Sequence, residues 1–444
     1  MAKKKLDRRQ MIRQSFGATT ALMVGIQFPS MAVGDQLTFT GFDGQTVVWG
    51  GISYLPNDGL TSLPNFLPLL GKTDPGSSVP ILNNVLTQAL ESVDPAVWES
   101  KDFRLSIAEG GQGGTARYGM IMAVAAELTI QDSRTDINSF SVLRLIAYNF
   151  IFNIDKSGGR KVIASYPVGG RIYSAKDGFD KTPLSEYYLG MFTTKNADGD
   201  TIADFYSQKL KDYKFEEIKL GLDYRVKAVR LNPEAKAGLQ ALGVPEQTFT
   251  DWIGFATSMS YGEKLKVSMV PFQDSRASTG DLAINFRGKE AFRLTLPEGD
   301  VLITPRIMEW KIGYSDHPRD KNQFAQEINI WVQITIQNKA FDDASVRRFK
   351  QVFQATEVQS VFKKEEYRRS DTATIFLLIE QILDKAFEAI AKPEQRDVLI
   401  KGYKKVFPST ERNREIKEYI SVKVDERTAT TFERDCQQTF EMLL

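Results

Sequence analysis

The sequence is poorest in the two residue types that most often cross-link chains and bind metals. Its 444 residues include one cysteine, Cys436, and one histidine, His317. A single cysteine excludes a disulfide within the chain, and one residue of each type excludes a metal cage built from Cys and His ligands. Catalysis without a bound cofactor would therefore rest on carboxylate, Lys, Tyr or Ser side chains.

The sequence also lacks an excess of charge of either sign. It carries 57 Lys and Arg against 56 Asp and Glu, a net charge of +1. The body of the chain contains no basic stretch interleaved with aromatic residues, which nucleic-acid readers need. We therefore expect no nucleic-acid partner. With 42% hydrophobic residues, the chain is long enough for two or three globular domains with buried cores.

Beyond the N-terminal region, no apolar run reaches the ~20 residues that a membrane-spanning helix needs, so we expect no transmembrane segment in the mature chain. Residues 1–32 have the pattern of an export signal, with a basic start, a moderately apolar core and a small-residue cleavage site that ends at Ala32. Arg8 and Arg9 lie in a context that resembles the twin-arginine motif. The predicted location is the periplasm, with association with the outer membrane left open.

Hydrophobic periodicity predicts a long β-hairpin in each half of the chain. Strict alternation from Ile328 to Ile336 predicts a strand, and the run from Val346 to Val358 predicts its partner. In the first half, Phe140–Ile154 alternates in the same way and Val162–Tyr173 returns. Further apolar runs precede the hairpins at Thr46–Tyr54, Phe103–Ala108, Tyr118–Ile130 and Val301–Ile312.

Apolar residues at helical spacing predict helices over Pro80–Ser92 and from Asp371 to the stop at Pro393, with a further helix at Thr248–Tyr261. Such mixed order predicts an α/β or α+β fold of two repeated mixed-sheet modules with long β-hairpins and flanking helices. The expected division is a signal peptide at 1–32, modules at 33–210 and 211–392, and a charged helical tail at 393–444. The tail is either a solvated face or a docking surface.

Several short motifs carry a resemblance to a known group of proteins. Val85–Leu90, Leu105–Gly110, Ala116–Gly119 and Ala147–Asp155 resemble the α/β module shared by the curli secretion-channel protein and the N-terminal domain of TolB. Leu265–Arg276 is similar to an opening motif of periplasmic members of this group. Tandem modules in an exported chain also resemble the flagellar outer-ring protein of marine bacteria.

This resemblance implies such a module over about residues 45–210 and 220–392. The second half departs from the pattern, because no clear helix follows Phe272. Its elements are therefore either permuted or belong to a different α+β fold. The membrane-inserting hairpins of the curli channel are not carried over, because each hairpin here needs its apolar face for its own core.

A glycine-rich stretch raises the question of a dinucleotide site. Gly111, Gly113 and Ala116 fit the degenerate fingerprint G-x-G-x-x-A, and Asp132 lies at about the distance of the ribose-binding acid. The fingerprint requires a helix and then a second strand in between, yet Met120–Ile130 runs on without a break. One extended strand after a loop is simpler, so we expect no cofactor and keep these four residues as weak candidates.

Other residues with chemical potential have plain structural explanations. His317 lies in a turn-like polar loop beside Ser315 and Asp316, and sequence neighbours rarely form triad geometry. Asn196–Asp200 resembles half a calcium loop, but Ser207 occupies the position of the bidentate Glu. Cys436 is expected to be a small, semi-buried thiol in a helix.

Together these features favour an exported, non-catalytic scaffold or assembly protein of the periplasm or outer membrane. It would act through contacts with an envelope protein complex or with other copies of itself, in a secretion or flagellar type of assembly. The alternative is a twin-arginine-exported enzyme with a bound cofactor, an oxidoreductase or a hydrolase, because that export route carries folded proteins.

Overall fold

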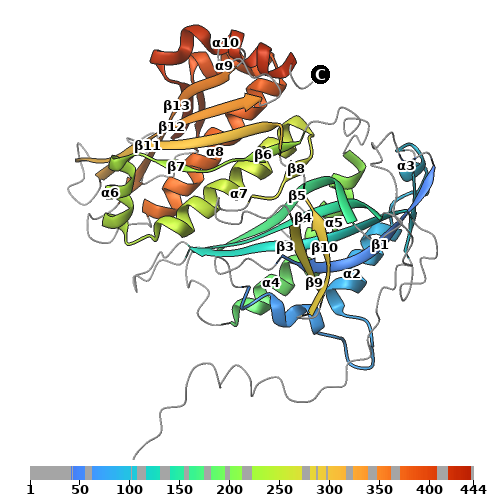
Figure 1. Cartoon of the computed structure of the whole chain (residues 1–444). Helices are drawn as coiled ribbons and strands as arrows, with labels where there is room; N and C mark the ends of the chain where they lie inside the picture. The colour runs from blue at the N-terminus through green and yellow to red at the C-terminus, as the bar shows by residue number, and fades with distance from the viewer. Residues whose placement is uncertain are drawn as a thin grey trace, which may run out of the picture.

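The computed structural model describes residues 42, 44–55, 63–101, 103–107, 117–130, 141–154, 160–174, 182–195, 201–212, 223–272, 281–286, 289–296, 299–316, 324–338, 348–361, 371–407 and 419–441. Two mixed β-sheets and the helices packed on them make up an α+β fold, which confirms the predicted class (Figure 1).

The first sheet contains seven strands: β1 (Gln45–Tyr54), β2 (Phe103–Ser106), β3 (Tyr118–Ile130), β4 (Ser141–Ile154), β5 (Arg160–Ser174), β9 (Asp281–Phe286) and β10 (Lys289–Thr295). Their order is β2-β1-β3-β4-β5-β10-β9. β1 is parallel to β2 and β3, the pairs β3–β4 and β4–β5 are antiparallel, and β5 is parallel to β10. β9 also pairs with β1, through Asn285 and Tyr54, so the sheet closes on itself.

Both faces of the first sheet are buried. One face packs against η1 (Leu67–Gly71), α2 (Ile81–Glu91), α3 (Pro95–Glu99), α4 (Leu184–Thr193) and α5 (Ile202–Asp212). Along β4, Leu145 and Ala147 point into this helical layer, while Tyr148 and Phe150 point to the other side. Alternate residues of one strand therefore contribute to two different cores, as the period of two requires.

The second sheet contains eight strands: β6 (Tyr224–Val226), β7 (Arg230–Leu231), β8 (Met269–Val270), β11 (Val301–Asp316), β12 (Phe324–Asn338), β13 (Arg348–Val361), β14 (Tyr403–Val406) and β15 (Tyr419–Val424). The order is β14-β15-β13-β12-β11-β6-β8, with β7 beside β11. Along β12 the residues from Ile328 to Ile336 are alternately buried and half-buried, which confirms the strand with one buried face.

Helices cover the buried face of the second sheet. They are α6 (Pro233–Leu242), α7 (Glu246–Leu265), α8 (Asp371–Ala391), α9 (Glu394–Lys401) and α10 (Glu426–Glu441). The stripe predicted between Asp371 and Pro393 is the buried side of α8. Figure 1 shows the resulting layers, with α7 and α8 between the two sheets and α2 and α4 below the first sheet.

The two halves have the same topology. Strands β2-β1-β3-β4-β5 of the first sheet match β8-β6-β11-β12-β13 of the second in order and in direction. β6 is parallel to β8 and to β11, as β1 is parallel to β2 and β3. Helices α6 and α7 occupy the place of α2 and α3 in the chain. The second half is therefore not permuted, because its first strand is β6 rather than the run after Leu265.

One connection departs from this repeat. In the first half β2 leads to β3 across 107–117, whereas the segment from β8 to β11 includes the hairpin β9–β10. That hairpin joins the first sheet, where Thr295 of β10 is paired with Lys161 of β5. The division at 33–210 and 211–392 stays a prediction, but strands from the second range complete the first sheet.

The C-terminal tail is helical at α9 and α10, and two strands lie between these helices. β15 pairs with β13 over six residues, and β14 pairs with β15. Phe432 of α10 is buried against Phe349 and Phe353 of β13. The tail is thus part of the second module, since Leu399, Val422, Val424 and Phe432 are buried in that module's core.

Glycines of helix α7 lie in tight packing against its own module and against β5 of the first half. A Cβ atom built on Gly254 would lie 2.4 Å from the ring of Phe272, and one on Gly262 would lie 2.9 Å from Met269 and 3.2 Å from Pro167 of β5. Only residues without a side chain let the helix backbone approach this closely. By contrast, a Cβ on Gly190 of α4 would meet nothing within 4 Å.

Replacing Gly254 by Val is expected to lower the free energy of unfolding by about 1–3 kcal/mol, because the added methyl groups overpack the contact with Phe272. Gly190→Ala is the matched control and should raise it by up to about 1 kcal/mol, the gain in helix propensity. Urea unfolding followed by circular dichroism measures both. Equal effects of the two substitutions would contradict the tight packing of α7.

Candidate functional site

The junction of the two modules contains a buried ion pair. Arg144 of β4 contacts Glu380 of α8, and both residues are less than a tenth exposed. Trp252 of α7 donates its indole N–H to Glu380 Oε1 at 2.9 Å, and the Arg144 guanidinium lies 5.2 Å from the Trp252 ring centroid. One residue from the first sheet and one from each of two helices thus form a single charged cluster.

Removing one partner of a buried ion pair leaves the other charge unpaired in a poorly solvated site, and this destabilises the folded chain. Glu380→Ala should therefore lower the free energy of unfolding by about 3–5 kcal/mol. Arg144→Met combined with Glu380→Gln removes both charges and keeps an acceptor for Trp252, so it should cost far less. Urea unfolding compares the two, and a double variant as unstable as the single one would contradict a coupled pair.

Hydrogen bonds also join the two sheets along β5. The backbone N–H of Ser165 donates to Ser268 Oγ at 2.9 Å, and the Ser165 hydroxyl donates to the carbonyl of Met269 in β8. Further along the junction, the backbone N–H of Phe272 donates to the Tyr148 hydroxyl at 3.3 Å. Burial raises the pKa of Tyr148 to about 12.

Two carboxylates meet where the first sheet leads into the second. Asp300 accepts a hydrogen bond from the backbone N–H of Asp223 at 3.1 Å, and the Asp223 carbonyl accepts one from the Asp300 N–H at 2.7 Å. Burial and the negative charge of Asp300 raise the pKa of Asp223 to about 6, against a smaller opposing effect of Lys161. Asp223 therefore changes charge close to neutral pH.

Because the folded-state pKa of Asp223 is raised, its contribution to stability is full below about pH 4 and is lost as the pH rises through about 6. Asp223→Asn removes the charge and keeps the shape. We expect its free energy of unfolding to match the native chain at pH 4 and to exceed it by about 2–3 kcal/mol at pH 8, since one pKa unit is worth about 1.4 kcal/mol. Urea unfolding between pH 4 and 8 measures the difference, and a constant difference would contradict this assignment.

A hollow of about 200 Å³ lies between α8, the end of α7 and strand β14. Its lining combines amines, carboxylates and aromatic rings: Lys264, Gln381, Asp384, Lys385, Glu388, Tyr403, Lys405, Phe407 and Ile420.

Both carboxylates of the hollow, Asp384 and Glu388, already interact with neighbouring side chains. Burial raises the pKa of Glu388, but Lys385 at 2.9 Å and Lys392 at 3.4 Å outweigh it and hold that pKa below its ordinary value. Asp384 accepts the Ser260 hydroxyl at 2.6 Å, and burial raises the pKa of its carboxyl. Lys405 forms no ion pair with a described carboxylate. Lys264 forms none within 4 Å, although Asp384 and Glu263 attract its charge. The hollow can therefore offer positive charge to an anionic group.

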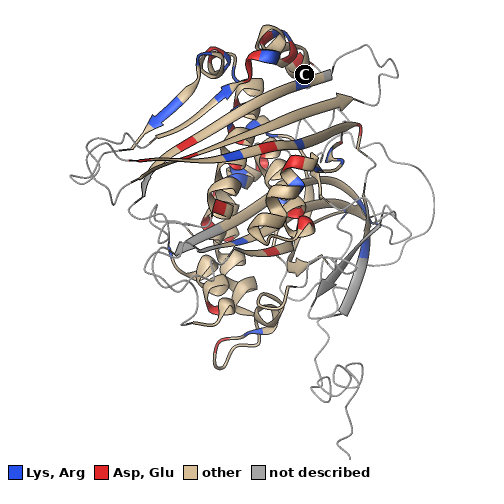
Figure 2. Cartoon of the chain, turned by 90° about the vertical axis from the view of Figure 1, so that its left-hand side faces the viewer, with Lys and Arg blue, Asp and Glu red and all other residues tan. Residues whose placement is uncertain are grey.

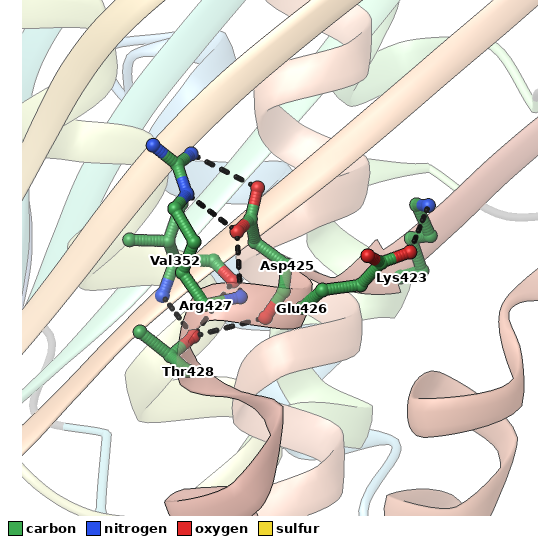
Figure 3. A network of polar contacts seen from close by, with 6 residues as sticks. All are labelled: Val352, Lys423, Asp425, Glu426, Arg427 and Thr428. Carbon is green, nitrogen blue, oxygen red and sulfur yellow. Dashed lines mark hydrogen bonds and ion pairs between the residues drawn. The ribbon is translucent and has the colours of Figure 1, made fainter.

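A polar network attaches the C-terminal helix α10 to β13 (Figure 3). The backbone N–H of Asp425 donates to the Val352 carbonyl at 2.8 Å, and the Val352 N–H donates to Thr428 Oγ1 at 3.1 Å. Arg427 donates to both carboxylate oxygens of Asp425, at 2.6 and 2.9 Å, and these bonds lower the pKa of Asp425 despite partial burial. β15 is thereby linked to α10 and held on β13.

The residues considered from sequence contribute little to these clusters. Gly111, Gly113, Ala116 and Asp132 lie outside the described residues. The segment that a dinucleotide fold needs as a helix is strand β3, as expected. The residues of the predicted export signal (Arg8, Arg9 and Ala32) also lie outside the described residues. So do 196–200, which resemble half a calcium loop, and His317 with its loop, except that Ser315 and Asp316 end β11.

Cys436 is fully buried in α10, and burial raises its pKa to about 12, so it is an unreactive thiol. Among the described residues no group of three or more His, Cys, Asp and Glu side chains could hold a metal ion. None of the described helices combines the length and the apolar character needed to cross a membrane.

Sequence reasoning missed the charged groups that the fold brings together. The sequence contains one signal for this pair. Arg144 and Glu380 each interrupt an apolar run, and because such runs form cores, both charged side chains are buried. No signal joins Lys264, Lys385 and Lys405, which come from three elements and meet only in the folded chain.

No protein-family model matches the chain, and no curated protein matches it. Among solved structures, a minor lipoprotein from Acinetobacter baumannii is similar over 39% of this chain and 91% of that chain, at 10% identity and a TM-score of 0.18. That score is too low for the likeness to describe this fold or its function.

Proposed function

We propose that this chain is an exported, non-catalytic scaffold or assembly protein of the bacterial envelope, acting through protein–protein contacts. The observation that supports this role most is the joining of two modules of the same topology into one body. They share a core around α7, the buried pair Arg144–Glu380 and the exchanged hairpin β9–β10. A scaffold needs surfaces held at fixed spacing, and this arrangement supplies them.

The proposed location rests on the export pattern of residues 1–32 and on the resemblance to tandem modules of envelope proteins. Internal repetition of strand order in the two halves supports the tandem part of that resemblance. The proposed partners are an envelope protein complex or further copies of the chain. In this proposal the chain needs no cofactor, because contacts alone carry out its role.

The export step is tested by the double variant Arg8→Lys, Arg9→Lys, which keeps the charge and removes the twin-arginine pair. We expect the native chain in the periplasmic fraction, shortened by cleavage after Ala32, and the variant at full length in the cytoplasm. Cell fractionation with intact-mass measurement distinguishes them. Equal distribution of the two chains would contradict twin-arginine export.

The scaffold role is tested by cross-linking in cells, followed by affinity purification and mass spectrometry. A scaffold should give reproducible cross-links to a small set of envelope proteins or to its own copies, at sites that map to the folded surface. The same double variant of Arg8 and Arg9 is the matched control, because a chain kept in the cytoplasm should lose those cross-links. If the native chain and this control gave the same partners, the proposed role would fall.

A further inference from the structure

Strand β14 forms one edge of the second sheet. Among the described residues it pairs with β15 alone. An edge strand presents a row of main-chain N–H and C=O groups, which can pair with an added strand. Val406 on this strand is 56% exposed, and nearby α9 exposes Val398 and Ile400. The edge therefore combines hydrogen-bonding capacity with apolar surface open to solvent.

The charge of this edge restricts what can pair with it. Lys404 lies 3.6 Å from the ring centroid of Tyr419, and Lys405 lies 5.6 Å from that of Phe407, but neither pairs with a described carboxylate. Figure 2 shows blue segments on the outermost strands of the second sheet. A second copy of β14 would bring lysines against lysines, which is unfavourable between facing strands. An acidic strand would meet complementary charge.

The hollow lies on one face of the second sheet beside β14. A strand added next to β14 would direct every second side chain to that face. Tyr403 and Lys405 face this side and line the hollow together with Lys264 and Lys385. A neighbouring strand would run about 4.8 Å beyond β14, with every second side chain pointing to the same face. Carboxylates at alternate positions would then approach Lys405, which has no described carboxylate partner, and Lys264, which Asp384 and Glu263 attract from beyond ion-pair distance.

We propose that β14 binds an extended, acidic segment of a partner protein as an added strand, with alternate Asp or Glu side chains directed to the hollow. The main chain of the segment extends the second sheet, and the lysines select its charge. This site deepens the proposed scaffold role and rests on it. Cross-linking detects a partner bound anywhere on the chain, so the role and this site can fail separately.

The test uses three fluorescent eight-residue peptides and the purified chain. The first alternates Glu and Val, the second alternates Lys and Val, and the third is the acidic peptide with every backbone nitrogen methylated. Fluorescence anisotropy at low salt should give binding of the acidic peptide, at least tenfold weaker binding of the basic one, and a similar loss on methylation. Equal binding of the acidic and basic peptides, or of the methylated and unmethylated ones, would overturn the proposal.

Substitutions in the chain locate the site. Lys264→Glu combined with Lys405→Glu should weaken binding of the acidic peptide at least tenfold while the thermal unfolding midpoint stays within a few degrees. Lys350→Glu is the control, because Lys350 is an exposed lysine of the same sheet on β13, away from the hollow. If it weakened binding as much as the Lys264 and Lys405 double variant, the attraction would be to overall charge and the site would be disproved.

Discussion

Helix α7 lies between two sheets, and its middle part is buried on every side, including Asp251, Thr257, Ser258 and Ser260. A helix in this position cannot have a solvent-facing stripe, and its small and polar residues are explained by contacts with a different element on each face. Its glycines admit Phe272 and Pro167, and Trp252 reaches the ion pair between β4 and α8. The first sheet, the second sheet and α8 are therefore positioned relative to one another through this helix.

The same constraint explains why the repeat is uneven. Both halves share strand order and direction, but in the part of the chain that the structure describes, the connection after β8 alone carries a hairpin that leaves its own module. The hairpin β9–β10 lies beside β5 and returns to β1, at the side of the first sheet that faces the second half. Because α7 holds the two sheets close together, a short hairpin that leaves the second sheet can pair with strands of the first. The glycine-rich stretch 111–116 occupies the corresponding connection of the first half, between β2 and β3.

Long elements were predictable because their period repeats often enough to be read. The strand expected at Tyr118–Ile130 has the bounds of β3, and the helix before Pro393 is α8. The elements that were missed are short, exchanged or charged. β6 has three residues and β8 two, too few for a period, while β9 and β10 belong to a sheet far away in sequence. In β14 and β15, lysines interrupt the alternation that tertiary pairing with β13 supplies. The hollow escaped prediction for the same reason, since its lysines meet only after these strands have paired.

Edges of sheets are the places where such a body can still accept a strand. The hairpin β9–β10 closes the first sheet between β5 and β1, which leaves the four-residue β2 at its border. At one border of the second sheet, β8 is covered because Ser268 and Met269 bond to Ser165 of β5. The opposite border, β14, is the one among the described strands that combines a single strand partner with exposed Val406 and amines without a described carboxylate. The border at β8 is thus covered by the chain itself, and β14 is the border at which we propose that a partner strand is added and selected by charge.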